Sequence, residues 1–313
     1  MRLVRHLSDL PFKDLADGSV VTIGSFDGLH MGHLQLLDRV IRKSKEAGVP
    51  SVVMSFEPTP KEVFSVDNPP ARLMRFREKF DALCDYGIDV FYCPRFDVAM
   101  RSIRSDDFIR QILVHGLNAR HIVVGDDFRF ARRRLGKVEE LIRVKRALDF
   151  EVDQMPTLIA HDIRVSSTAI REALTEGDLR RATLLLGRPY RMSGRVVRGR
   201  QVGRTLGFAT ANVDIRRRQS AVLGIFAVRV SGLEGGPVDA VASVGTRPTF
   251  DLVKPLLEVH LFDFDRDIYG ETIHVDFIEH IRSEVKFDSI DDLVAQMNED
   301  AENARSILAA EAV

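Results

Sequence analysis

The stretch "GSVVTIGSFDGLHMGHLQLLDRVIRKSKEAG", residues 18–48, joins a strand-like segment to a helix-like segment through a turn rich in glycine and histidine. The opening "GSVVTI" has the β-branched density of a buried strand, and "LQLLDRVIRKSKEAG" repeats apolar residues at helical spacing before Gly48. A strand-to-helix turn aims backbone N–H groups and the positive end of a helix dipole at one point. The sequence therefore predicts an anionic ligand, such as a phosphate, at this turn.

Short apolar segments alternate with amphipathic segments from residue 20 to about residue 160. This alternation predicts a Rossmann-like α/β domain with a parallel sheet, whose ligands bind beyond the carboxyl ends of the strands. Three polar segments each follow a predicted strand, and we expect them to share that rim: "SFDGLH" (25–30), "SFEPTP" (55–60) and "GDDFRF" (125–130). The segment 165–187 is expected to be helical, with serine and threonine caps and a stop at Gly187.

The pattern of apolar, glycine and proline residues changes after Gly187. Short strand-like segments separated by glycine and proline turns predict a small antiparallel barrel. Only the tail "SIDDLVAQMNEDAENARSILAAEA", residues 289–312, has a clear helical pattern. We therefore expect two domains, residues 1–186 with the α/β fold and residues 187–313 with a mainly β fold and a C-terminal helix.

The composition is that of a soluble globular chain of 313 residues, with 45% hydrophobic and 29% charged residues. A net charge of −1 gives no electrostatic case for nucleic acid or an anionic membrane as a partner. Cys84 and Cys93 are too few for a disulfide framework, which fits a reducing compartment. No apolar run approaches the ~20 residues of a membrane helix. We expect a cytoplasmic protein, and the sequence makes no prediction of its oligomeric state.

The two histidines of the turn, His30 and His33, raise the question of a metal site. Zinc-binding pairs on a helix usually sit four residues apart and need a third ligand, so we do not expect zinc. The pattern G-x-F-D-G-x-H-x-G-H, from Gly24 to His33, resembles the nucleotidyltransferase superfamily, whose H-x-G-H signature handles ATP phosphates. The resemblance implies that both imidazoles stabilise charge at the α-phosphate. Taken alone, so short a motif is more typical of a tight turn with locally satisfied histidines.

Three further segments, "SFEPTP", "VVGDDFRF" and "VSSTAIRE", extend the match. They resemble, in the same order, the signatures of the FMN adenylyltransferase module of bacterial bifunctional riboflavin kinase/FAD synthetases. The resemblance implies two sets of residues: for ATP and its phosphates Gly24, Phe26, Asp27, Gly28, Ser166, Thr168 and Arg171, and for flavin Gly125, Asp127 and Phe128. Ala131 stands where the family usually has glycine, so we expect an altered loop there.

The glycine-rich stretch "GRVVRGRQVGRTLGFATANVDI", residues 194–215, resembles the nucleotide loop of riboflavin kinase, whose signature ends in P-T-A-N. The resemblance implies that Thr210 and Asn212 ligate Mg²⁺ on ATP; neutral oxygens suit this ion because phosphates supply most of the negative charge. It also implies close backbone approach to the nucleotide at Gly199, Gly203 and Gly207. Ala209 replaces the family's proline, which removes a rigid φ restraint.

The strand-like "LLEVHLF", residues 256–262, alternates polar and apolar positions, so Glu258 and His260 share one face. Alternation alone predicts a solvent-facing polar row. The resemblance to riboflavin kinase instead implies that Glu258 is the base that accepts a proton from the terminal ribityl hydroxyl. "HIRSEVKFDS", residues 280–289, resembles the segment that closes over the flavin, which implies flavin contacts from Arg282 and Phe287. Ser243 departs from the asparagine often found in the family.

The complete match predicts a bifunctional enzyme. Riboflavin and ATP give FMN and ADP in the barrel, and FMN and a second ATP give FAD and pyrophosphate in the first domain, both with Mg²⁺. One alternative is a nucleotidyltransferase for another phosphorylated substrate with an inactive barrel; the intact Thr210, Asn212 and Glu258 argue against it. Another is a non-catalytic flavin- or RNA-binding regulator that uses the arginine runs 132–134 and 216–218; the retained histidines oppose it.

Overall fold

The computed structural model describes residues 1–10, 15–199, 208–248 and 253–311, so the predictions for Gly203 and Gly207 lie outside the described residues. The chain divides into two compact units. The first comprises residues 1–70 and 75–165, and the second comprises residues 71–74 and 166–313. The division of the catalytic modules at residue 186 stays a prediction.

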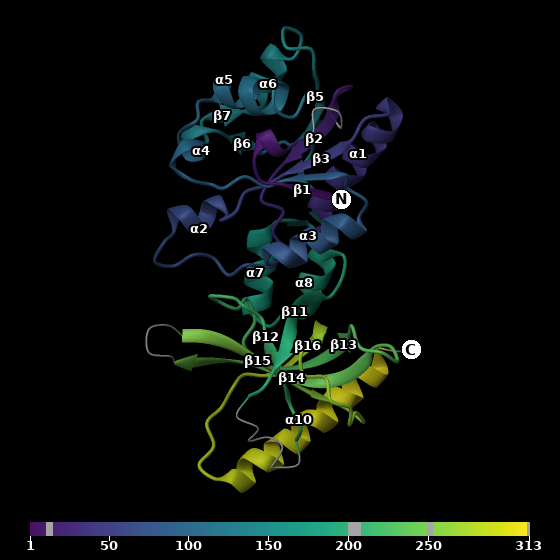
Figure 1. Ribbon diagram of the computed structural model, residues 1–313. Coiled ribbons are helices and arrows are strands. Elements are labelled where there is room, and N and C mark those ends of the chain that lie inside the picture. The colour runs from purple at the N-terminus through teal and green to yellow at the C-terminus, as the bar shows by residue number, and fades with distance from the viewer. Residues whose placement is uncertain (11–14, 200–207, 249–252, 312–313) are drawn as a thin grey trace. The chain divides into compact units, whose positions relative to one another are not determined.

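The first unit contains a six-stranded sheet in which every neighbouring pair of strands is parallel (Figure 1). The strand order is β1 (Arg2–Val4), β4 (Val90–Tyr92), β3 (Ser51–Met54), β2 (Ser19–Ile23), β5 (Ala119–Gly125) and β8 (Glu151–Met155). All residues of β2 and β3 are buried, as expected for strands covered on both faces. The predicted parallel α/β domain is confirmed.

Helical segments cover both faces of this sheet. Val40 of α1 packs with Val20 and Val123, whereas Ile109 and Leu141 pack with Val21 on the opposite face. The helical segments of the unit are η1 (Leu7–Asp9), α1 (Met31–Ala47), α2 (Pro60–Phe64), α3 (Phe76–Asp85), α4 (Val98–Ser102), α5 (Ser105–Asp107), the π-helix η2 (Phe108–Val114), η3 (Arg132–Arg134) and α6 (Val138–Val144). Two small hairpins pair β6 (Arg129–Phe130) with β7 (Gly136–Lys137) and β9 (Ile159–Ala160) with β10 (Ile163–Arg164).

The order β3-β2-β5 places the carboxyl ends of three parallel strands beside one another. "SFDGLH", "SFEPTP" and "GDDFRF" each begin within two residues of one of these three ends. The prediction that the three segments share one rim is therefore confirmed. The rim lies at the edge of the sheet where ligands of open α/β folds bind.

The helical segment of residues 165–187 consists of two helices, α7 (Ser167–Thr175) and α8 (Leu179–Leu186), rather than one. Gly177 has a φ of 79°, and the Asp178 side chain caps α8 by accepting from the Arg181 N–H. Left-handed backbone followed by a new N-cap ends one helix and starts another. The predicted cap at Ser166 and stop at Gly187 are both confirmed.

The second unit contains a closed antiparallel barrel, which confirms the predicted architecture. Its strand order is β11 (Tyr190–Val197), β12 (Ala211–Asp214), β15 (Val253–Leu261), β14 (Val238–Pro248), β13 (Gly224–Ser231) and β16 (Thr272–Arg282). The C-terminal helix α10 (Ile290–Ala310), yellow in Figure 1, is capped by Ser289 and packs Ala304 and Leu308 against Ala227 and Phe262. Within the described ranges, no helix is both long enough and apolar enough to cross a bilayer.

Candidate functional sites

The turn after β2 is built by unusual backbone angles. Phe26 and Leu29 have φ values of 48° and 42°, and Gly28 has a φ of 89°. His30 then caps α1, because its Nδ1 accepts from the backbone N–H of His33 at 3.3 Å. An imidazole that accepts at Nδ1 carries its hydrogen on Nε2 when neutral, so His30 can present an Nε2–H donor.

The rings of His30 and His33 are stacked, with centroids 3.6 Å apart and planes 16° apart. Burial, followed by the nearby His30 and Lys79, holds the pKa of His33 well below its ordinary value. His33 as a whole is half-buried, but its Nδ1 is enclosed and has no hydrogen-bond partner among the described residues. The structure thus brings both predicted histidines together, and the lowered pKa of His33 suits that ring to a hydrogen-bonding role better than to a fixed charge.

Lys79 is a residue of this site that the sequence reasoning missed. It lies on α3, is only 3% exposed, and its ammonium donates to the Ser25 carbonyl and to Ser55 Oγ. A signal existed in the sequence, because Lys79 and Leu83 occupy the same buried helix face at positions i and i+4. A lysine on an apolar face is seldom fully buried without a specific role.

The three predicted flavin residues of the first unit lie at the end of β5. Asp127 is exposed and forms an ion pair with Arg164. Phe128 is half-buried and stacks on Phe130 with ring centroids 5.5 Å apart. Gly125 ends β5, and a Cβ there would make only an ordinary van der Waals contact with the Asp127 carboxylate. Their contact with flavin stays a prediction.

Ala131, which departs from the family pattern, has φ 61° and ψ −166°. This backbone region is almost exclusive to glycine and costs a residue with a side chain of order 1–3 kcal/mol. The loop thus keeps the conformation that a glycine favours although an alanine occupies the position. The adjacent arginines 132–134 are exposed.

Ser166, Thr168 and Arg171, the remaining predicted phosphate contacts, belong to the second unit. Ser166 accepts from the Ala169 N–H, and Thr168 is exposed in the first turn of α7. The Arg171 guanidinium donates to the carbonyls of Ala71 and Ser167 at 2.6 and 3.0 Å. The structure therefore shows Arg171 tying the segment 71–74 to α7, and its contact with ATP stays a prediction.

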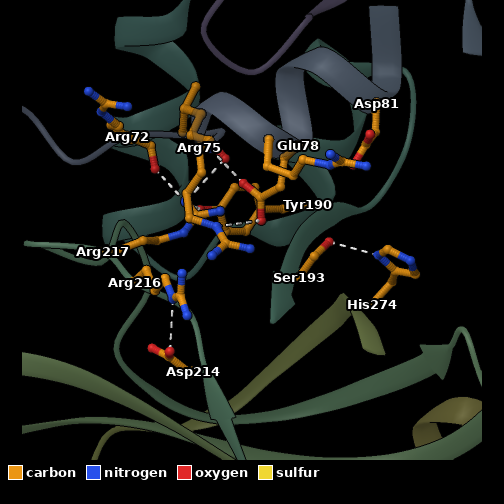
Figure 2. A network of polar contacts seen from close by, with 12 residues as sticks. Arg72, Arg75, Glu78, Asp81, Tyr190, Ser193, Asp214, Arg216, Arg217 and His274 are labelled. Atoms are coloured by element: carbon orange, nitrogen blue, oxygen red, sulfur yellow. Dashed lines mark hydrogen bonds and ion pairs between the residues drawn. The ribbon is translucent and has the colours of Figure 1, made fainter. Parts of the chain in front are cut away.

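Arg217 has a similar tethering role, which Figure 2 shows. It is 7% exposed and donates to the carbonyls of Arg72 and Leu73 and to the Tyr190 hydroxyl oxygen. Arg216 beside it pairs with Asp214. Two of the three arginines in the run 216–218 are thus engaged within the unit, which weakens the interpretation of this run as a nucleic-acid contact.

The barrel brings Asn212, Glu258 and Ser243 into one row. In the antiparallel register Asn212 lies opposite Glu258, and Glu258 lies opposite Ser243. Directly opposed residues share one face, with Cβ atoms about 4.5–5.5 Å apart. Leu257 and Val259 are fully buried on the inner face, so the row lies on the outer face. Two predictions drawn from separate motifs, a metal ligand and a base, thus meet at one place.

The candidate magnesium ligands fit the ion chemically. Asn212 is 6% exposed, and its Oδ1 is enclosed without a hydrogen-bond partner among the described residues. An orphaned amide oxygen is suited to a hard cation, and the half-buried Thr210 lies two residues away. Within the described residues, no three His, Cys, Asp or Glu side chains cluster as a metal site.

His260 anchors the segment that leads to Thr210. Its Nδ1 lies 2.9 Å from the Ala209 carbonyl, which can only accept, so Nδ1 carries the hydrogen. Phe208 packs edge-on against the same imidazole, with ring centroids 5.0 Å apart. These contacts restrain the position where the family's proline is missing.

Glu284 is a second carboxylate at this site that the sequence reasoning did not single out. A Cβ on Gly245 would overlap its carboxylate, which therefore lies directly over β14 beside the row that contains Glu258. Burial and then the charge of Glu258 raise the pKa of Glu284, against the opposing charge of Arg282. Two carboxylates close together disfavour double ionisation.

Of the two predicted flavin contacts in the second unit, Arg282 is the last residue of β16 and Phe287 lies on the segment that follows. Arg282 forms a two-pronged ion pair with Asp300 of α10, at 2.7 and 2.6 Å, and its guanidinium lies 5.8 Å from the centre of the Phe287 ring. The structure shows Arg282 fixing this segment to α10. Flavin contacts from Arg282 and Phe287 stay predictions.

Gly199 offers a test of the barrel site. A Cβ there would overlap the Asn212 side-chain amide, so Gly199→Ala must displace this flexible side chain. We expect riboflavin phosphorylation to fall by about 10- to 100-fold, the usual cost of disturbing a group that orients a metal site. FAD synthesis from supplied FMN should persist in the same variant. Steady-state kinetics of both reactions checks this, and unchanged phosphorylation would remove Gly199 from the site.

Comparisons with known proteins show the family to which the chain belongs. A family model for FAD synthetase matches residues 13–169, and one for riboflavin kinase matches residues 186–308. The chain is 42% identical to a bifunctional riboflavin kinase/FMN adenylyltransferase of Escherichia coli K12, over 97% of each chain. It is 41% identical to the Haemophilus influenzae protein of the same name, over 98% of this chain and 99% of that one.

A solved structure also resembles the whole chain. A crystal structure described as a macrolide-efflux protein from Streptococcus pneumoniae has a TM-score of 0.83 and 33% identity, covering 97% of this chain and 98% of that one. The two family models together span both units, and the curated relatives match nearly end to end. The chain therefore belongs to the bifunctional riboflavin kinase/FMN adenylyltransferase family.

Proposed function

We propose that the chain phosphorylates riboflavin with ATP to give FMN and ADP, and then adenylylates FMN with a second ATP to give FAD and pyrophosphate. The observation that carries this proposal is the register of the barrel. In this register Asn212 lies opposite Glu258, which supports a shared site for the proposed metal ligand and the proposed base. An inactive barrel would have no need for this arrangement, which speaks against a nucleotidyltransferase acting alone.

In the kinase reaction, Glu258 accepts the proton of the ribityl hydroxyl as the γ-phosphoryl group is transferred. Thr210 and Asn212 would hold Mg²⁺, which when bound supplies charge neutralisation at the ATP phosphates. Gly199 allows the backbone to approach the Asn212 amide closely. His260 holds the Ala209 carbonyl and so restrains the segment that carries Thr210.

In the adenylyl transfer, the turn of residues 24–33 handles the phosphates of ATP. A phosphate oxygen of FMN attacks the α-phosphorus, and the bond to pyrophosphate breaks. The stacked imidazoles of His30 and His33 donate hydrogen bonds to the charge that develops on these oxygens. Ser166, Thr168 and Arg171 contact the phosphates, and Gly125, Asp127 and Phe128 contact the flavin. We also propose that the enzyme acts in the cytoplasm.

Product analysis with and without Mg²⁺ tests the proposal. Purified protein incubated with riboflavin, ATP and Mg²⁺ should yield FMN first and then FAD, separated by chromatography. EDTA should stop both steps and added Mg²⁺ should restore them, whereas a chelator selective for zinc should change nothing. FAD from supplied FMN without any FMN from riboflavin would instead indicate the nucleotidyltransferase with an inactive barrel. Salt-dependent RNA binding without turnover would indicate the regulator.

A further inference from the structure

We infer that Lys79 is a positioning residue for adenylyl transfer, which fixes the Ser25–Phe26 peptide at the phosphate-handling turn. The inference rests on the proposed role of residues 24–33. It concerns a side chain that comes from α3, outside every motif that defines the turn. The ammonium group is enclosed, since Lys79 is 3% exposed, and it donates to the carbonyl of Ser25.

The same carbonyl receives a second hydrogen bond. Ser55 Oγ donates to the Ser25 oxygen at 3.2 Å and lies 3.5 Å from the Lys79 ammonium. Ser55 follows β3, whereas Ser25 follows β2, so the three groups join the ends of two neighbouring strands at the rim. Hydrogen bonds from a charged donor are the stronger kind, which makes Lys79 the main restraint on this carbonyl.

When the Ser25 carbonyl is held in one direction, the direction of the Phe26 N–H is set as well. A trans peptide is planar, so the Ser25 C=O and the Phe26 N–H point in opposite directions. The Phe26 N–H is thereby turned away from Lys79, and among the described residues no hydrogen-bond partner is found for it. A backbone N–H held in one direction at such a turn is suited to donate to a phosphate oxygen.

The restraint is needed because the turn is strained. Phe26 has a φ of 48°, which a residue with a side chain seldom adopts without support from its surroundings. The ammonium also contributes fixed positive charge near the histidines, and it is one cause of the lowered pKa of His33. Lys79 therefore acts on the peptide and on the imidazole through position and charge, without touching the reacting atoms.

Kinetics of Lys79→Met in the full-length chain test the inference. We expect kcat for FAD synthesis from FMN to fall by about 10- to 100-fold, as for a small misplacement of a reacting group. The KM for FMN should stay within about twofold, and riboflavin phosphorylation should be unchanged. The melting temperature should stay close to that of the wild type, because methionine keeps the packing of the lysine stem and Ser55 Oγ still donates to the Ser25 carbonyl. Lys45→Met is the matched control, because it makes the same substitution at an exposed lysine on α1, and it should behave like the wild type.

Three results would overturn the inference. One is a kcat for Lys79→Met within about threefold of the wild type. Another is a parallel loss of both activities and of melting temperature, which would indicate a purely structural role. The third is a greater loss for Ser55→Ala, which keeps the ammonium, than for Lys79→Met. His33→Ala, assayed alongside, distinguishes failure of the proposed site from failure of the Lys79 inference. Full FAD synthesis in His33→Ala would refute the proposed site itself. Loss of FAD synthesis in His33→Ala, together with normal FAD synthesis in Lys79→Met, would refute only the role of Lys79.

Discussion

Glu258→Gln is expected to lower riboflavin phosphorylation by about 10²-fold or more, within the range of general-base effects. Glutamine keeps the size and polarity of the side chain but cannot accept the proton of the ribityl hydroxyl. Binding of ADP with Mg²⁺ should survive, because Thr210 and Asn212 are unchanged. FAD synthesis from supplied FMN should also persist, since that reaction uses an ionised phosphate and the first unit. Rates of FMN formation and titration with ADP check both expectations.

Glu284 makes this experiment more specific, because it is a second carboxylate beside Glu258. Burial and Glu258 raise its pKa against the charge of Arg282, but its carboxylate lies over Gly245 and not opposite Asn212, the proposed metal ligand. Glu284→Gln should therefore cost less phosphorylation than Glu258→Gln. Glu234→Gln, at an exposed turn, should cost none. If Glu258→Gln phosphorylates riboflavin at a near-normal rate, Glu258 is only a polar residue of the outer face and is not the base of the kinase reaction.

Much of the fold could be predicted because its signals are local. The β-branched "SVVTI" of β2 and the glycine stop of α1 follow from propensity and capping. The parallel-sheet rule then placed three polar segments on one rim. Membership of residues 71–74 in the second unit was not predictable, since it depends on hydrogen bonds from Arg171 and Arg217 to backbone carbonyls. The break at Gly177–Asp178 was readable from a glycine followed by a capping residue.

The candidate sites likewise contain residues that the sequence identifies and residues that only the structure reveals. His30, His33, Asn212 and Glu258 were named because motifs mark them, but their neighbours depend on register and packing. Nothing in the sequence states that Asn212 faces Glu258, because the pairing of β12 with β15 is set by the closed barrel. Lys79 and Glu284 also escaped notice, since a charged residue on a helix or after a strand is normally read as exposed.

His33→Ala is expected to lower FAD synthesis from FMN by about 10²-fold or more, the typical cost of losing an electrostatic stabiliser of the transition state. The low pKa of His33 means that the ring is neutral near pH 7, so the variant loses a hydrogen-bonding group and not a fixed charge. His30 should keep its cap on α1, because its Nδ1 accepts from the backbone N–H at position 33, which alanine retains. The fold should therefore survive, and riboflavin phosphorylation in the same protein should stay nearly intact.

His115→Ala, which removes an exposed imidazole from the same unit, should leave both activities unchanged. Equal loss of both activities in His33→Ala would point to unfolding, and retention of FAD synthesis would make the stacked pair a structural feature of the turn.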